Sequence, residues 1–125
     1  MRIRSKFKTL EEWLTDICDN IKPEKHIEEY KLSLSESSGK FTLELLGVNI
    51  YQENRITNVR TEFKPKNMYF RLPHKEYKNL DRKQAQERVS IQLKEFVLTD
   101  KFKASYLSEA NAVVTTYNGE KIWTK

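Results

Sequence analysis

The chain has 125 residues, of which 38% are hydrophobic and 33% are charged, values that predict one globular domain covering residues 1–125. Only three glycines and three prolines, together with 14 aromatic residues (2 Trp, 6 Tyr and 6 Phe), argue against a disordered or collagen-like chain. No apolar run is long enough to cross a membrane. A single cysteine rules out an intramolecular disulfide, and charged residues follow the basic N-terminus in place of a signal-peptide core, so we expect a cytoplasmic protein.

The formal net charge of +5 is unevenly distributed along the chain. Residues 2–8 carry four basic groups and no acidic one, residues 9–54 carry four basic against ten acidic groups, and residues 55–88 carry ten basic against four acidic groups. Such polarity suits electrostatically steered association with a partner. We expect residues 1–8 to form a basic arm that docks loosely on the domain.

An amphipathic helix is predicted to begin after Thr9. Thr9 is a favourable N-cap residue, and Glu12 lies three positions later, where it would complete a capping box. Pro23 prevents continuation, so the helix should end between residues 20 and 22. The apolar stripe has helical spacing and consists of Leu10, Trp13, Leu14, Ile17, Cys18 and Ile21.

Alternating apolar and polar residues predict four strands in the next part of the chain, at about 27–35, from Lys40 onward, at about 59–64 and at 67–72. A turn at 36–39 joins the first two, and a polar loop at 52–58 follows the second. Gly47 interrupts the alternation of the second strand. We therefore expect a bulge near Gly47 that restores the register and places Val48 and Ile50 inward.

The C-terminal part should contain a second helix and a hairpin. Asp81 and Gln84 form a capping-box pair at the start of the helix, whose apolar stripe is Ala85, Val89, Leu93, Phe96 and Val97. Residues 99–108 are predicted as a short helical turn or a loop, and Asn118-Gly119 as the turn of a hairpin. The expected order, α-β-β-β-β-α-β-β, describes a two-layer α+β domain with a mainly antiparallel sheet packed on two helices.

The residues that most often carry catalysis or bind metals are few and isolated. His26 and His74 have no partner at metal-ligand spacing, and both are interpreted as surface residues. Cys18 lies on an apolar stripe, where a buried thiol is favoured over a nucleophile.

No phosphate-binding, dinucleotide-binding or serine-nucleophile motif occurs in the sequence. Adjacent carboxylates such as Glu28 and Glu29 diverge on a strand and make poor acid–base pairs. We therefore expect a protein that is not an enzyme and that uses neither cofactor nor metal.

The outward side of the strands is the best candidate for a binding surface. If Phe41, Leu43, Val59, Phe63, Met68 and Phe70 face the helices, their neighbours face solvent. A mixture of apolar, aromatic, arginine and carboxylate groups is typical of protein-binding patches, although it also fits an ordinary sheet face with cross-strand ion pairs. The predicted partner-binding residues are Glu44, Leu46, Arg60, Glu62, Tyr69 and Arg71.

The basic segment 60–88 supports an alternative function, nucleic-acid binding. Its basic groups are interleaved with Tyr69, Phe70 and Tyr77, which could stack on bases while the cations follow a phosphate backbone. The ordinary interpretation, in which the cations are solvated and Phe70 belongs to the core, is favoured because no RNA-binding signature is present. The basic groups are Arg60, Lys64, Lys66, Arg71, Lys75, Lys78, Arg82, Lys83 and Arg88.

Four stretches together resemble a group of small bacterial proteins. They are the capped helix Thr-Leu-Glu-Glu-Trp-Leu, the strand Phe-Thr-Leu-Glu-Leu-Leu-Gly, the helix end Gln-Leu-Lys-Glu-Phe-Val, and the closing Ala-Val-Val-Thr-Thr-Tyr-Asn-Gly-Glu-Lys-Ile-Trp. This pattern is similar to that of cytoplasmic immunity proteins of bacterial toxin–immunity pairs, including contact-dependent inhibition systems. The resemblance implies a non-enzymatic protein that binds and neutralises one cognate toxin domain. Immunity proteins against nucleases are often acidic, which the first half of this chain, but not the whole, would match.

Overall fold

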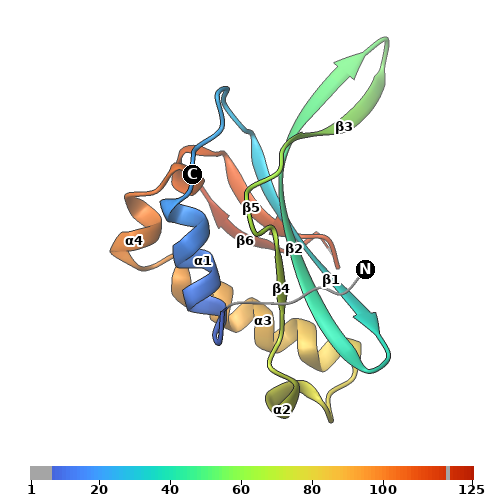
Figure 1. Ribbon diagram of the computed structural model, residues 1–125. Helices are drawn as coiled ribbons and strands as arrows, with labels where there is room; N and C mark the ends of the chain where they lie inside the picture. The colour runs from blue at the N-terminus through green and yellow to red at the C-terminus, as the bar shows by residue number, and fades with distance from the viewer. Residues whose placement is uncertain (1–6, 118) are drawn as a thin grey trace.

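The computed structural model describes residues 7–117 and 119–125 and contains helices and a mixed sheet (Figure 1). Most of residues 1–8, the predicted basic arm, lie outside this description. The elements are α1 (Leu10–Asp19), β1 (Glu29–Ser37), β2 (Lys40–Glu53), β3 (Ile56–Phe63), β4 (Tyr69–Arg71), α2 (His74–Tyr77), α3 (Arg82–Phe96), α4 (Asp100–Lys103), the 3-10 turn η1 (Tyr106–Glu109), β5 (Ala112–Thr115) and β6 (Lys121–Thr124).

The sheet has the strand order β3-β2-β1-β5-β6, and β4 pairs with β2 on the same edge as β3. Every neighbouring pair is antiparallel except β1 and β5, which run parallel because the helices α2, α3 and α4 connect the two halves of the sheet. The predicted α+β class and the mainly antiparallel sheet are confirmed. The parallel pair at the centre of the sheet was not predicted.

Both predicted helix starts are confirmed. The Thr9 hydroxyl accepts the backbone N–H of Glu12 at 3.1 Å, but the Glu12 carboxylate accepts from the N–H of Lys8 instead of that of Thr9. The box at the start of α3 is complete, since Asp81 and Gln84 each accept the other's backbone N–H. Ile21 was wrongly assigned to the apolar stripe: α1 ends at Asp19, and the Ile21 side chain is 89% exposed.

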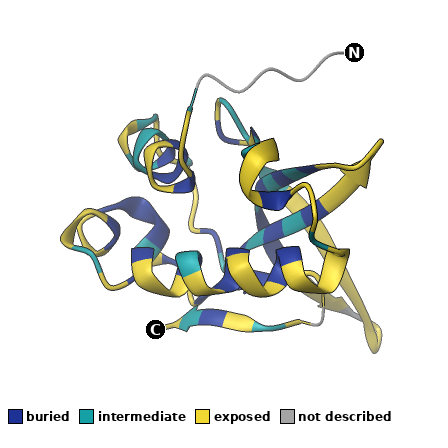
Figure 2. Ribbon diagram, turned by 90° about the horizontal axis from the view of Figure 1, so that it is seen from below, coloured by how far each residue is buried: buried dark blue, intermediate teal, exposed yellow. Residues whose placement is uncertain are grey.

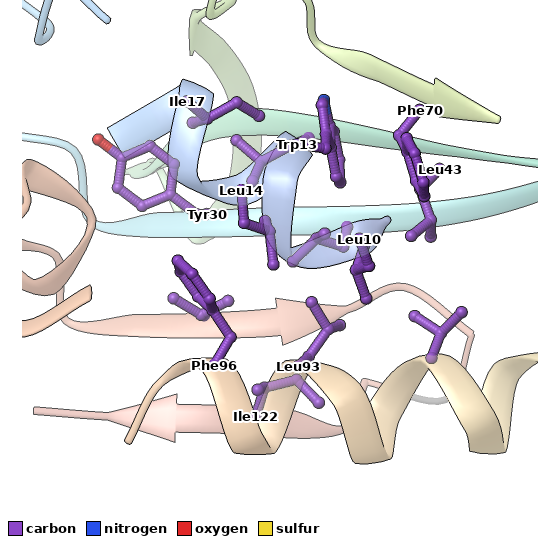
Figure 3. Packing of buried hydrophobic residues seen from close by; sticks show 14 of the residues in the cluster. Leu10, Trp13, Leu14, Ile17, Tyr30, Leu43, Phe70, Leu93, Phe96 and Ile122 are labelled. Atoms are coloured by element: carbon purple, nitrogen blue, oxygen red, sulfur yellow. The ribbon is translucent and has the colours of Figure 1, made fainter. Parts of the chain in front are cut away.

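The core lies between one face of the sheet and the helices α1 and α3 (Figure 3). Trp13 of α1 stacks on Phe70 of β4, with ring centroids 5.5 Å apart, and its indole N–H donates to the carbonyl of Asn67 at 2.7 Å. The whole predicted stripe of α3 is buried. Residues 99–108 form α4 and most of η1, and the hydroxyl of Tyr106 donates to the carbonyl of Ile17 at 2.7 Å, which fixes this segment on α1.

Two predicted connections have different outcomes. Strands β5 and β6 form the predicted antiparallel hairpin, although Asn118 lies outside the described residues. The polar loop predicted at 52–58 is wrong. Strand β2 continues to Glu53, a two-residue turn follows at Asn54 and Arg55, and β3 begins at Ile56. Both turn residues have positive φ, 50° and 71°, as the favoured hairpin turns require.

No helix among residues 7–117 and 119–125 is long and apolar enough to cross a membrane.

Candidate protein-binding surface

Four of the six predicted partner-binding residues lie together on the face of the sheet turned away from the core. Glu44 and Leu46 belong to β2, while Tyr69 and Arg71 belong to β4. Tyr69 pairs with Glu44, and Arg71 pairs with Thr42, so all four share the side opposite Phe41, Leu43 and Leu45. A hydrogen bond to the Glu44 carboxylate raises the pKa of Tyr69 above its ordinary value. We call this group the outer-face residues.

The other two, Arg60 and Glu62, lie on the opposite side of the sheet, which corrects the prediction. Arg60 pairs with Asn49, an odd-numbered residue of β2 that shares the side of Leu45. The register then moves from Thr61 opposite Val48 to Phe63 opposite Gly47, so Glu62 is the extra residue of a bulge in β3. The predicted bulge therefore exists at this level but belongs to the partner strand.

Gly47 is not itself the bulged residue, and its role is in packing. A Cβ at this position would lie 3.0 Å from Cβ of Phe63, 3.1 Å from Ile27 and 3.2 Å from Tyr30. Because β2 keeps its alternation through Gly47, Val48 lies on the outer side, where its neighbours bury it, and Ile50 is 38% exposed. The predicted inward positions of Val48 and Ile50 are wrong, as is that of Val59, which is 51% exposed.

Beyond the core, β2 and β3 continue as a two-stranded hairpin that projects from the body of the domain (Figure 1). We call residues 49–61 the arm. Every residue of β3 from Ile56 to Thr61 is exposed, and the burial colouring shows the same for this end of the sheet (Figure 2). The large hydrophobic side chains exposed on the arm are Ile50, Tyr51, Ile56 and Val59. This is the largest group of such side chains on any one element pair of the described chain.

The base of the arm is fixed by hydrogen bonds to the segment that precedes β1. The side-chain amide of Asn49 accepts the N–H of Glu28 at 2.7 Å and donates to the carbonyl of His26 at 3.1 Å. The Glu28 carboxylate in turn accepts the N–H of Ile50 at 2.9 Å. The arm is therefore held in a defined direction although its own side chains pack against little else.

Charged and aromatic side chains on one side of the arm form a second set of contacts. The guanidinium of Arg60 lies 5.0 Å from the ring centroid of Tyr51, whose hydroxyl donates to Glu62 at 2.7 Å. Lys25 also contacts Glu62, at 2.6 Å. These contacts, that of Lys25 first, lower the pKa of the Glu62 carboxyl, and Glu62 raises the pKa of Lys25. We call Lys25, Tyr51, Arg60 and Glu62 the root cluster.

The basic groups of segment 60–88 are spread over the length of the molecule. Arg60 lies on the arm, whereas the positively charged residues of α2 and the start of α3 lie at the opposite end (Figure 1). Two arginines are held by the fold: Arg82 donates to the carbonyl of Leu34 at 2.8 Å, and Arg88 donates to that of Glu76 at 2.6 Å while lying over the ring of Tyr77. The structure thus does not gather the segment into one patch.

The described part of the chain has several hollows. One, of about 510 Å³, lies between α1, β4 and the end of α3; core side chains such as Leu14 and Phe96 form its floor. The hydroxyls of Thr9 and Thr99 at its edge cap α1 and α4. Another, of about 380 Å³, includes His26 beside Tyr30 and Tyr106. Burial raises the pKa of both tyrosines above its ordinary value.

The remaining candidate groups are distributed singly. Burial raises the pKa of the Cys18 thiol, which lies half-buried near Ser105 and so remains protonated. His74 is exposed at the start of α2. In the part of the chain that the structure describes, no three His, Cys, Asp or Glu residues lie close enough to hold a metal ion.

No protein-family model, curated protein or solved structure matches this chain.

Proposed function

We propose that this protein binds another protein through the arm and does no chemistry of its own. The observation that carries the proposal is the exposure of Ile50, Tyr51, Ile56 and Val59 on a hairpin whose base is fixed. Apolar and aromatic side chains grouped on an exposed surface mark interaction sites. Arginine and tyrosine beside them are the residue types that most often dominate the energy of protein interfaces.

The resemblance to immunity proteins gives this proposal its partner class, a bacterial toxin domain that the protein neutralises. Neutralising a toxin domain by binding needs an exposed surface, for which a projecting hairpin with mixed apolar and charged groups is suitable. The outer-face residues Glu44, Leu46, Tyr69 and Arg71 lie on the same sheet and offer a second, more polar surface.

The experiment is capture of the polypeptide encoded immediately upstream, followed by titration calorimetry with purified proteins. The double variant Ile56→Ser/Val59→Ser should weaken binding by at least about tenfold, because it removes two exposed apolar contacts. Ile91→Ser is the matched control: Ile91 on α3 is 60% exposed, close to the 62% of Ile56, but lies outside the arm.

Co-expression tests the toxin part of the proposal separately. Cells producing the upstream polypeptide should grow only when the wild-type protein or the Ile91→Ser control is present. If the upstream polypeptide neither binds nor impairs growth, the immunity role is wrong.

A further inference from the structure

Among residues 7–117 and 119–125, strand β3 lies at the edge of the sheet and pairs with β2 alone, in the strand order β3-β2-β1-β5-β6. Edge strands expose backbone N–H and C=O groups that can pair with another chain, and proteins usually blunt them with lysine, proline or a bulge. Between Ile56 and Arg60, β3 contains neither lysine nor proline.

The hydrogen bonds of β2 show which backbone groups of β3 point outward. The N–H of Ile50 points toward β1, where it donates to Glu28, whereas the N–H of Leu45 points to the other edge and donates to the carbonyl of Met68. In an antiparallel pair, a residue whose groups point away from the partner strand lies opposite one that does the same. Val59 lies opposite Ile50, and Thr57 lies opposite Gln52. The N–H and C=O groups of Thr57 and Val59 therefore point away from the sheet.

The two edges of the arm, formed by β2 and β3, differ in how their backbone groups are covered. On the β1 side, the Glu28 carboxylate caps the exposed N–H of Ile50. At the free edge, formed by β3, the bulge at Glu62 interrupts the pairing with β2 near the base of the arm. The regular part of the edge is left between Ile56 and Arg60, a length that accommodates a short added strand.

The side chains beside this edge define what such a strand would contain. On one side of the arm, Val59 and Ile50 offer an apolar surface; on the other, Arg60 carries a positive charge over the ring of Tyr51, and Ile56 lies nearer the turn. An incoming strand with alternating apolar and acidic residues would place each kind beside its complement. A second copy of β3, paired antiparallel about Val59, would instead bring two Arg60 side chains onto the same side of the joint sheet.

We propose that the partner binds by strand addition, in which an extended segment with alternating apolar and acidic residues pairs with the free edge of β3 at Thr57 and Val59. Main-chain hydrogen bonds supply the affinity in this mode, and alternate side chains supply the specificity. The inference rests on the proposed protein-binding function and specifies how the arm carries it out.

The test compares two substitutions at Val59, with the upstream-encoded polypeptide as the probe. Val59→Pro removes the outward N–H, and proline is tolerated on an edge strand at a position that does not donate to the neighbouring strand. Val59→Thr keeps the N–H and a β-branched side chain. Val59→Pro should weaken binding by about tenfold or more, and Val59→Thr by no more than about threefold. Circular dichroism and thermal unfolding of the free variants establish that both fold.

Hydrogen exchange in the wild-type complex gives a readout that needs no variant. The amide protons of Thr57 and Val59 should exchange more slowly in the complex than in the free protein. Wild-type affinity for Val59→Pro, or unprotected amides in the complex, would overturn strand addition while leaving the protein-binding role intact. A free protein that sediments as a dimer and becomes monomeric with Val59→Pro would assign the edge to a second copy and also overturn it. Absence of wild-type binding would overturn the protein-binding role itself.

Discussion

At the scale of single residues, the roles of Gly47 and Glu62 follow from the side chains around them more than from their residue type. Gly47 lies in regular strand backbone, where glycine is normally unfavourable, because three side chains leave no room for a Cβ. Glu62 is an extra residue of a bulge, yet it joins Lys25 and Tyr51 in the root cluster. Both residues act at the place where the arm leaves the core.

Substituting Gly47 should destabilise the fold. Gly47→Ala would place a methyl group 3.0 Å from Phe63, so the unfolding free energy should fall by about 1–3 kcal/mol. Urea denaturation measures this change. Gly39→Asn is the control: Gly39 has φ of 74° and no atom within 4 Å of an added Cβ, and asparagine tolerates that conformation. A loss from Gly39→Asn as large as that from Gly47→Ala would contradict the packing explanation.

The root cluster predicts a pH response. Because Lys25 and Tyr51 lower the pKa of Glu62, the cluster is fully formed above the ordinary glutamate pKa and is lost as the pH falls through the lowered value. Lys25→Met should move the pKa of Glu62 upward, and Tyr51→Phe should move it upward by less. Carboxyl ¹³C titration by NMR measures both. A Glu62 pKa that does not respond to Lys25→Met would show that the pair does not persist in solution.

At the scale of elements, the sequence predicted correctly those helices and turns whose formation depends on residues close together in the chain. The N-cap residues Thr9 and Asp81, the apolar stripe of α3 and the Asn-Gly hairpin depend on neighbours within a few positions, and the sequence contains those neighbours. The ends of Lys40–Glu53 and Ile56–Phe63 were predicted wrongly because their polar residues suggested a loop. A two-stranded arm needs no buried side, so alternation carries no information there.

The candidate surface was predicted in part for the same reason. The burial of Phe41, Leu43 and Phe70 in the core fixes which side of β2 and β4 faces the helices. The residues that alternate with them therefore face away from the core, as predicted for Glu44, Leu46, Tyr69 and Arg71. Glu62 is the extra residue of the bulge and Arg60 lies beyond it, where a shift of one residue in register transfers side chains to the other side of the sheet. The close packing of Gly47 against Ile27 and Tyr30 joins distant positions of the chain, which the alternation of residues within one strand does not reveal.

The complete capping box of α3 should be worth a measurable part of the stability. Asp81→Ala leaves the N–H of Gln84 without its acceptor and should lower the unfolding free energy by about 0.5–2 kcal/mol. Lys83→Ala, an exposed position in the first turn of the same helix, is the control and should change it by less than about 0.5 kcal/mol. Equal effects of the two variants in thermal or urea unfolding would rule out the cap as the cause.

At the scale of the whole molecule, the part that holds the fold together differs from the part that we propose binds a partner. The core between the sheet and the helices α1 and α3 holds the fold, whereas the arm contributes exposed side chains that add little to it. The basic groups of segment 60–88 are spread over the length of the molecule, and Arg82 and Arg88 are held by the fold, which disfavours a continuous path for a phosphate backbone (Figure 1).

The spread of these basic groups predicts how the protein would respond to nucleic acid, the alternative partner. Fluorescence anisotropy with single-stranded DNA or RNA across a salt series should show weak binding with a shallow dependence on salt, because few cations act together. Submicromolar binding that weakens steeply with salt would favour the nucleic-acid function over the proposed one.

The most direct test of the central claim is a map of the bound surface. The ¹⁵N-labelled protein is titrated with the unlabelled upstream-encoded polypeptide, and the amide shifts are followed residue by residue. If the arm binds the partner, the large changes in amide shift fall on residues 49–61 and the neighbouring root cluster, while α3 around Ile91 stays unchanged. Changes concentrated on α3 or along the cleft between α1 and α3, with residues 49–61 unaffected, would contradict it.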